Sequence, residues 1–359
     1  MAPSHRHVRF LPLGLGILSL LVAMWAGLVR MGWALPPVHR TWVGRHGPLM
    51  VAGFLGTVIS LERAVALKRA WTYLPPVLTG LGGLVLLFGL PAKLGIVLIT
   101  LGSLGLIAVF GLIVQRQPAL FTLAMALAAV LWAVGNALWL LDRSIPVAVP
   151  WWIGFLVMTI AGERLEMTRL TRMSAFGRNA FLAASAVYLA GLATSVALYD
   201  LGIRVAGVGL AGLGLWLLQY DVARRTVRQR GLPRFIAVAL LVGYGWLTVA
   251  GVQALTFGGV VAGVRYDAIL HAIFLGFVVS MIFAHAPVIF PAVLGVTMPY
   301  RPAFYGHLAL LHLSLLLRIA GDLAGSVTWR QWGGMLNVIA LLLFLGNSAW
   351  ATHTARARA

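Results

Sequence analysis

Long uninterrupted runs of apolar residues fill most of this chain, and a few polar or charged residues separate each run from the next. Each run is roughly 18 to 25 residues long, the length that an α-helix needs to cross the hydrocarbon core of a bilayer. We therefore expect an all-α polytopic membrane protein in which residues 1–359 form a single transmembrane domain. The pattern predicts about twelve spans, near residues 10–32, 46–66, 73–90, 93–114, 118–141, 147–168, 180–199, 202–222, 234–257, 267–290, 303–321 and 332–352.

The composition is that of a protein surrounded by lipid. Hydrophobic residues make up 61% of the 359 residues and charged residues only 10%, too few to cover the surface of a water-soluble domain of this size. The chain contains no cysteine, which excludes disulfides, thiolate metal sites and cysteine nucleophiles. Any bound metal must therefore be held by nitrogen or oxygen ligands, with methionine sulfur as the remaining alternative.

The positive charge is distributed as a topology signal. The formal net charge is +19, but the basic residues lie in short clusters between apolar runs instead of on one face, so we expect no nucleic-acid partner. With the N-terminus inside, 18 of the 27 Lys and Arg residues fall on the inner side and eight on the outer side. Because inner loops carry the excess of basic residues, we expect a bacterial inner (cytoplasmic) membrane protein, embedded in lipid, with both termini in the cytoplasm.

A short motif recurs in the second, sixth and tenth spans. Its three copies are GFLGTVISLER from Gly53, GFLVMTIAGER from Gly154 and GFVVSMIFAHA from Gly276. Nine residues after each glycine stands an ionisable residue, namely Glu62, Glu163 or His285. The copies predict three tandem four-helix repeats, roughly 1–116, 117–231 and 232–359. The alternative is a chance match, since Gly-Phe is common in membrane helices.

Two histidines lie near the outer ends of two of these spans. His46 begins the second span, and His271 lies one turn inside the tenth, which enters the membrane from the same side. Two neutral imidazoles from different helices can hold a haem iron on both axial sides or contribute to a copper site. Asp267, four residues before His271, is placed to accept the other N–H of that ring. The alternative is an interfacial His46 and a hydrogen-bonded His271 without a metal.

A second polar site is predicted nearer the inner side. His285 follows His271 by fourteen residues, so the two rings stand roughly 21 Å apart along a helix and cannot bind one metal. The repeat puts Glu62 and Glu163 at the depth of His285, where His307 enters the eleventh span. An ionisable residue at such a depth is a functional candidate.

Four residues of this inner region are candidates for a metal site or for a proton path, namely His285, His307, His312 and Glu163. His312 follows His307 by five residues and points to a different face, so at most one of the two joins a given site. The alternative is that Glu62–Arg63 and Glu163–Arg164 are ordinary ion pairs at the membrane interface.

The span layout and two segments carry a family resemblance. The segments are HGPLMVAGFLGTVISLER (46–63) and HAIFLGFVVSMIFAHAPVIFPAVLG (271–295). They resemble the NnrS family of haem- and copper-containing membrane proteins and, more distantly, the catalytic subunit of haem-copper oxidases. The resemblance implies a haem-copper oxidase-like fold, a b-type haem held by His46 and His271, copper as a second metal, and a role in nitric oxide or nitrogen-oxide metabolism or stress protection.

The chain also departs from both patterns. The sixth and seventh spans contain no histidine, whereas oxidases place copper ligands there, so we do not expect dioxygen reduction. Gly47 and Pro48 stand where the His-Glu-Met segment of NnrS would continue, and LGVTMPY replaces the closing Gly-His-Thr-Gly. These differences are typical of a distant relative or a sister family.

Other classes of function remain open. In a transporter or channel without haem, a route for protons, metal or a small solute would be lined by Glu62, Glu163, His285 and His307. An assembly factor for another membrane complex is a third class. A haem protein with no soluble domain would receive electrons from a quinol or another membrane redox partner. The residues do not decide whether the chain is an enzyme.

Overall fold

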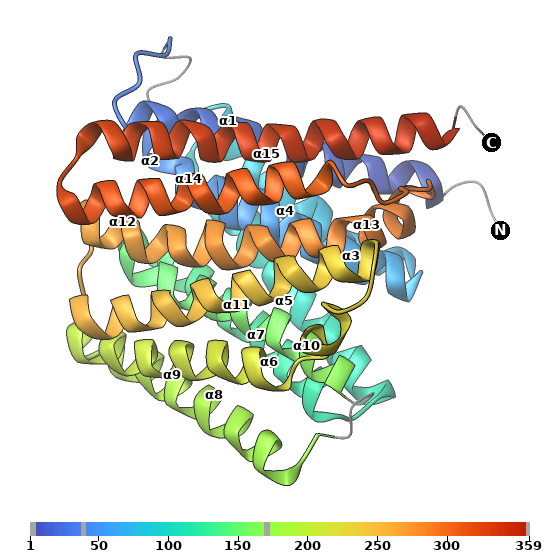
Figure 1. The fold of residues 1–359 in the computed structure, drawn as a ribbon, viewed down its shortest axis with the longest axis horizontal. Helices are drawn as coiled ribbons and strands as arrows, with labels where there is room; N and C mark the ends of the chain where they lie inside the picture. The colour runs from blue at the N-terminus through green and yellow to red at the C-terminus, as the bar shows by residue number, and fades with distance from the viewer. Residues whose placement is uncertain (1–4, 37–40, 169–172, 357–359) are drawn as a thin grey trace. The chain divides into compact units, whose positions relative to one another are not determined.

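The computed structural model describes residues 5–36, 41–168 and 173–356, and every regular element in those ranges is a helix. Eleven of the helices in this described part are long and apolar enough to cross a membrane. The prediction of a polytopic helical membrane protein is thus confirmed at this level (Figure 1).

One expected span is absent from the eleven. Helix α8 (Ala175–Ser195) covers most of the expected span 180–199 but is less apolar than the others, because Arg178 and Asn179 occupy its first turn. Each of the other expected spans coincides with one of the eleven apolar helices.

The chain divides into two compact units. The first comprises Met1–Gly162 and Ala292–Gly295, and the second comprises Glu163–Pro291 and Val296–Ala359. The division falls inside helix α7 (Ile145–Met167) and near the end of helix α13 (Ser280–Leu294).

In the first unit, α1 packs against the second span and against α4, while α5 packs on both α4 and α6. The close crossing of the second span and α4 depends on glycine: a Cβ on Gly83 would lie 3.0 Å from the Cα of Gly53. Small residues allow such approaches where lipid gives no hydrophobic drive for association. The elements are α1 (His5–Arg30), α2 (Trp42–Pro48), η1 (Leu49–Gly56), α3 (Thr57–Leu67), η2 (Ala70–Tyr73), α4 (Leu74–Leu87), α5 (Ala92–Arg116) and α6 (Leu120–Leu140).

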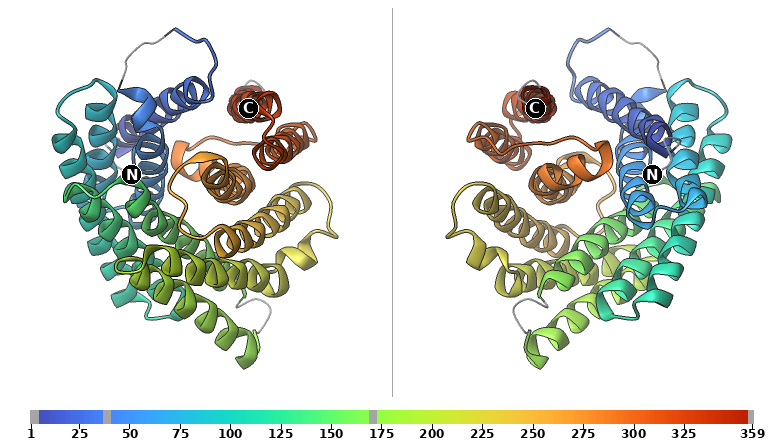
Figure 2. Two further views of the ribbon diagram at one scale, coloured as in Figure 1. Left: turned by 90° about the vertical axis from the view of Figure 1, so that its left-hand side faces the viewer. Right: turned by 90° about the vertical axis from the view of Figure 1, so that its right-hand side faces the viewer.

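In the second unit, α9 packs on α8 and α11, and α14 packs along α15 (Figure 2). The tenth span, formed by α12, η4 and α13, contacts α11 and α14. The elements after α8 are α9 (Tyr199–Tyr220), α10 (Ala223–Thr226), α11 (Leu232–Phe257), α12 (Gly263–His271), η4 (Ala272–Val279), α14 (Phe304–Ala324) and α15 (Val327–Arg356).

Two spans contain a π-helical segment of eight residues, η1 in the second span and η4 in the tenth. Both segments begin four residues before the glycine of the recurring Gly-Phe motif, Gly53 in one and Gly276 in the other. The two segments therefore occupy the same register of that motif, whereas α7 is a regular α-helix around Gly154. Because π-helical turns are rare and often found at functional sites, they direct attention to the residues beside them.

Candidate functional site

The second unit holds a cluster of charged side chains inside its spans. Arg318 on α14 donates from Nε to Oδ2 of Asp267 at 2.9 Å and from Nη2 to Oδ1 at 3.0 Å. This two-pronged geometry is the strongest form of an arginine–carboxylate contact. It ties α12 to α14, because Asp267 lies in α12.

Arg330 on α15 extends the cluster to a second carboxylate. Its Nε lies 3.1 Å from Oδ1 of Asp322, whose side chain is fully buried, and its Nη2 lies 3.9 Å from Oδ1 of Asp267. The two arginines balance the two aspartates in formal charge. Pairing of opposite charges offsets part of the cost of burying ionisable groups.

Glycines bring the backbones of α14 and α15 together at the depth of this cluster. A Cβ on Gly333 would lie 2.6 Å from the backbone nitrogen of Arg318, and one on Gly321 would lie 2.5 Å from that of Arg330. Gly325, at φ +69°, ends α14 in the left-handed conformation that glycine adopts without strain. The hairpin is therefore tight where the two arginines meet the carboxylates.

His271 stands at the edge of the cluster, as the last residue of α12 before η4. Its Nδ1 lies 2.8 Å from the backbone carbonyl oxygen of Asp267 and 3.4 Å from the carboxylate Oδ1 of the same residue. A carbonyl oxygen only accepts, so Nδ1 carries the hydrogen and the lone pair of a neutral ring lies on Nε2. In the part of the chain that the structure describes, no group hydrogen-bonds to Nε2. This is the orientation of a metal-binding imidazole.

His46 has the same ring orientation within the first unit. Its Nδ1 lies 2.6 Å from the backbone carbonyl oxygen of Ala23 on α1, so this nitrogen donates and Nε2 of a neutral ring bears the lone pair. Gly27 makes room for the ring, since a Cβ there would lie 3.0 Å from Cε1 of His46. His46 precedes η1 by three residues, while His271 directly precedes η4. Each candidate haem ligand thus stands at the start of a π-helical segment.

The residues expected at the inner side are divided between the two units. Glu62 belongs to the first unit, where its Oε1 lies 3.6 Å from Nη2 of Arg63. Glu163 and His285 belong to the second unit, and Nδ1 of His285 donates to the carbonyl of Met281 at 2.7 Å. Across the described residues, no three His, Asp or Glu side chains come close enough together to hold one metal ion.

His312 is engaged at both ring nitrogens. Trp246 donates from Nε1 to Nδ1 at 3.1 Å, and Nε2 lies 3.4 Å from Oγ of Ser280, which in turn donates to the carbonyl of Ala239 at 2.7 Å. The Trp246 ring packs on Gly276 of η4, where a Cβ would lie 2.5 Å from the indole. His312 therefore links α14 to α11 and to the first residue of α13 through hydrogen bonds, while Trp246 reaches the π-helical segment by packing alone.

His307 is surrounded by aromatic rings. Its side chain is buried, and the centroids of Phe283 and Phe344 lie 4.7 and 5.5 Å from that of the imidazole. Nδ1 lies 3.1 Å from Nδ2 of Asn347 on α15 and accepts a hydrogen bond from it. The contact joins α14 to α15.

The ion-pair partners inside the second unit were not among the residues expected from the sequence. Asp322 follows Arg318 by four residues, just past the end of the expected span 303–321. This spacing puts two ionisable residues on one helix face and is a local signal for part of the cluster. A second buried ion pair joins Arg164 to Asp221, with Nε to Oδ2 at 2.6 Å and Nη2 to Oδ1 at 2.9 Å. Because 57 residues separate this pair in the chain, no local pattern indicates it.

Comparison with known proteins gives the chain a family. No curated protein matches it. A family described as "Domain of unknown function (DUF8744)" matches residues 9–353, which include every helix from the start of the first span to the last turns of α15. The chain therefore belongs to the DUF8744 family.

Proposed function

We propose that this membrane protein binds a b-type haem through neutral histidine, with His271 as the principal ligand and His46 as the second candidate. The observation that carries the proposal is the state of His271. Its Nδ1 is fixed on the Asp267 carbonyl, and no described residue hydrogen-bonds to Nε2. Imidazole nitrogen is the commonest axial ligand of haem iron, so the donor fits the group.

Asp267 and Arg318 act in this proposal as positioning residues. Their two-pronged ion pair holds α12 against α14 and thereby sets the place of His271. A haem would supply an iron centre able to bind a small diatomic molecule or to change its charge by one electron. The family resemblance of the two histidine-led segments supports a role in nitric oxide or nitrogen-oxide metabolism or stress protection, with a quinol or a membrane redox partner as electron donor and copper as a candidate second metal.

The test is the visible spectrum of detergent-purified protein from haem-replete cells, oxidised and dithionite-reduced. His271→Ala is expected to lose most of the Soret band, and His46→Ala to weaken or shift it. His353→Ala is the matched control, because His353 is an exposed histidine near the end of α15. A colourless wild type, or an equal loss of the band in the control, would overturn the haem proposal.

A second function, transport of protons or a small ion, is favoured by the charged cluster itself. Asp267, Asp322, Arg318 and Arg330 lie inside spans, where ionisable residues commonly mark ion or proton routes. Asp322→Asn in proteoliposomes would then abolish proton uptake driven by an imposed potential. Asp200→Asn, which alters an exposed carboxylate paired with Arg204, is the control. Wild-type liposomes no more permeable than protein-free ones would exclude this alternative.

A further inference from the structure

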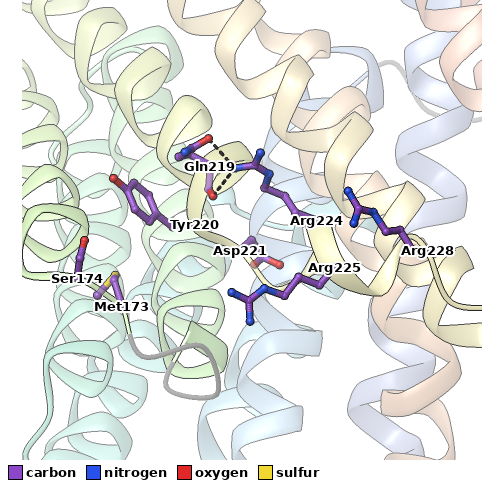
Figure 3. Close-up of a pocket in the computed structure, with 8 residues that line it drawn as sticks. All are labelled: Met173, Ser174, Gln219, Tyr220, Asp221, Arg224, Arg225 and Arg228. Atoms are coloured by element: carbon purple, nitrogen blue, oxygen red, sulfur yellow. Dashed lines mark hydrogen bonds between the residues drawn. The ribbon is translucent and has the colours of Figure 1, made fainter.

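The second unit contains a pocket of about 350 Å³ where α9 gives way to α10 and where α8 begins (Figure 3). Arg224, Arg225 and Arg228 line it from the α9–α11 connection, and Ser174 lines it from the start of α8. In Figure 3, the Arg225 side chain extends beneath Asp221 toward the side of the pocket formed by Met173 and Ser174. The pocket is separate from the cluster around His271.

Among the described residues that line this pocket, only Asp221 is acidic, and its charge is already balanced. Its two oxygens accept hydrogen bonds from Arg164, from the hydroxyl of Tyr244 at 3.1 Å and from the backbone nitrogen of Ala223 at 2.6 Å. Its side chain is fully buried. Asp221 therefore leaves the positive charge of the three lining arginines uncompensated.

Within the part of the chain that the structure describes, the three arginines have neutral partners or none. Arg224 donates from Nη1 to the backbone carbonyl of Gln219 at 2.9 Å and to its side-chain Oε1 at 2.6 Å. Within the described residues, Arg225 and Arg228 pair with no carboxylate. Guanidinium groups gathered around a pocket in this way favour a planar or tetrahedral oxyanion such as phosphate.

Helix α8 adds to the attraction for an anion. Ser174 is its N-cap and accepts a hydrogen bond from the backbone nitrogen of Gly177 at 3.1 Å. The positive end of the dipole of this 21-residue helix therefore faces the same pocket.

An apolar stripe on α9 leads to the pocket. Leu201, Val208 and Leu215, seven residues apart, are 50%, 47% and 56% exposed, and the spacing puts them on one helix face. Gln219 follows Leu215 by four residues on that face, and its side-chain oxygen accepts a hydrogen bond from Arg224. A basic pocket at the end of an apolar helix face matches a ligand that has an anionic head and a hydrocarbon tail.

We propose that this pocket binds the phosphate headgroup of an anionic phospholipid, with an acyl chain lying along the α9 stripe. Basic pockets between membrane helices recognise such headgroups. The shared chemistry is a phosphate, so free phosphate is the competing source. The lipid is favoured because the exposed apolar face continues directly from the pocket.

The experiment is native mass spectrometry of the detergent-purified protein titrated with cardiolipin, with phosphatidylcholine or with inorganic phosphate. Wild type is expected to retain cardiolipin in preference to phosphatidylcholine and to keep it in excess phosphate. Arg225→Gln together with Arg228→Gln should weaken cardiolipin binding about 30-fold, as two basic residues near a headgroup would.

The matched control is Arg178→Gln together with Arg230→Gln. This pair removes the same charge from exposed positions that do not line the pocket, and it should bind cardiolipin close to the wild-type level. Far-UV circular dichroism and gel filtration of both variants establish that they are folded. An equal loss in the control, displacement of the lipid by phosphate, or no preference for cardiolipin in wild type would each overturn the proposal.

Discussion

Arg318 and Asp267 form a two-pronged ion pair across two helices of the second unit, with nitrogen–oxygen distances of 2.9 and 3.0 Å. The side chains are only 9% and 16% exposed. Asp267 also offers its backbone carbonyl to Nδ1 of His271. One residue thus fixes both the helix packing and the orientation of the candidate ligand.

Breaking this pair is expected to cost more stability than breaking an exposed pair. Asp267→Asn leaves Arg318 without its charged partner in a buried place, and losing one member of a buried pair costs about 3–5 kcal/mol. Asp200→Asn breaks an exposed pair with Arg204 and is expected to change the melting temperature little, because solvent screens such a pair. Thermal unfolding in detergent, followed by tryptophan fluorescence, measures both. Equal midpoints for the two variants would contradict the structural role given to Asp267.

The close approach of α14 and α15 gives a second prediction. Gly333→Ala puts a Cβ 2.6 Å from the backbone nitrogen of Arg318, and such overpacking costs about 1–3 kcal/mol. Gly346→Ala lies in the same helix with nothing within 4 Å of its Cβ and is expected to be neutral or to stabilise by about 0.5–1 kcal/mol. The melting temperature should therefore fall for Gly333→Ala and not for Gly346→Ala, and a Gly333→Ala protein as stable as wild type would refute the tight crossing.

His312 is expected to act through hydrogen bonds and not as a metal ligand. His312→Phe removes the acceptor of Trp246 and the partner of Ser280, which costs about 1–3 kcal/mol because buried polar groups are left unpaired. The melting temperature should fall while any Soret band keeps its position and intensity. Loss of the band in a protein that remains folded would instead make His312 a ligand.

The expected topology can be tested with single cysteines, because the chain has none of its own. The positive-inside pattern predicts that Gln229 faces the cytoplasm and Ser144 the opposite side, and both are exposed. Ser144→Cys should react with a membrane-impermeant maleimide in intact spheroplasts, and Gln229→Cys only after the membrane is permeabilised. The reverse pattern would invert the predicted orientation.

Local sequence was sufficient to predict one contact of the candidate site, the one between Asp267 and His271. The spacing of four residues puts Asp267 and His271 on one helix face, and the structure has their atoms in contact. The accepting atom is mainly the backbone carbonyl, since Arg318 from another span engages the carboxylate. A four-residue spacing is a local property, whereas the choice of partner depends on which helix packs alongside.

By itself, the sequence determined that this protein is a bundle of membrane helices, because the length of each apolar run is set by the thickness of the bilayer. It also marked the Gly-Phe motif that recurs in both π-helical spans. Only the tertiary structure determined which side chains pair with one another. It brought together the charged cluster, the two hydrogen-bond partners of His312, and the partners that balance the charge of Asp221 at the arginine pocket. These features depend on contacts such as Arg318–Asp267, Arg164–Asp221 and Trp246–His312, whose residues lie 51, 57 and 66 positions apart. Chain-local periodicity does not encode such contacts.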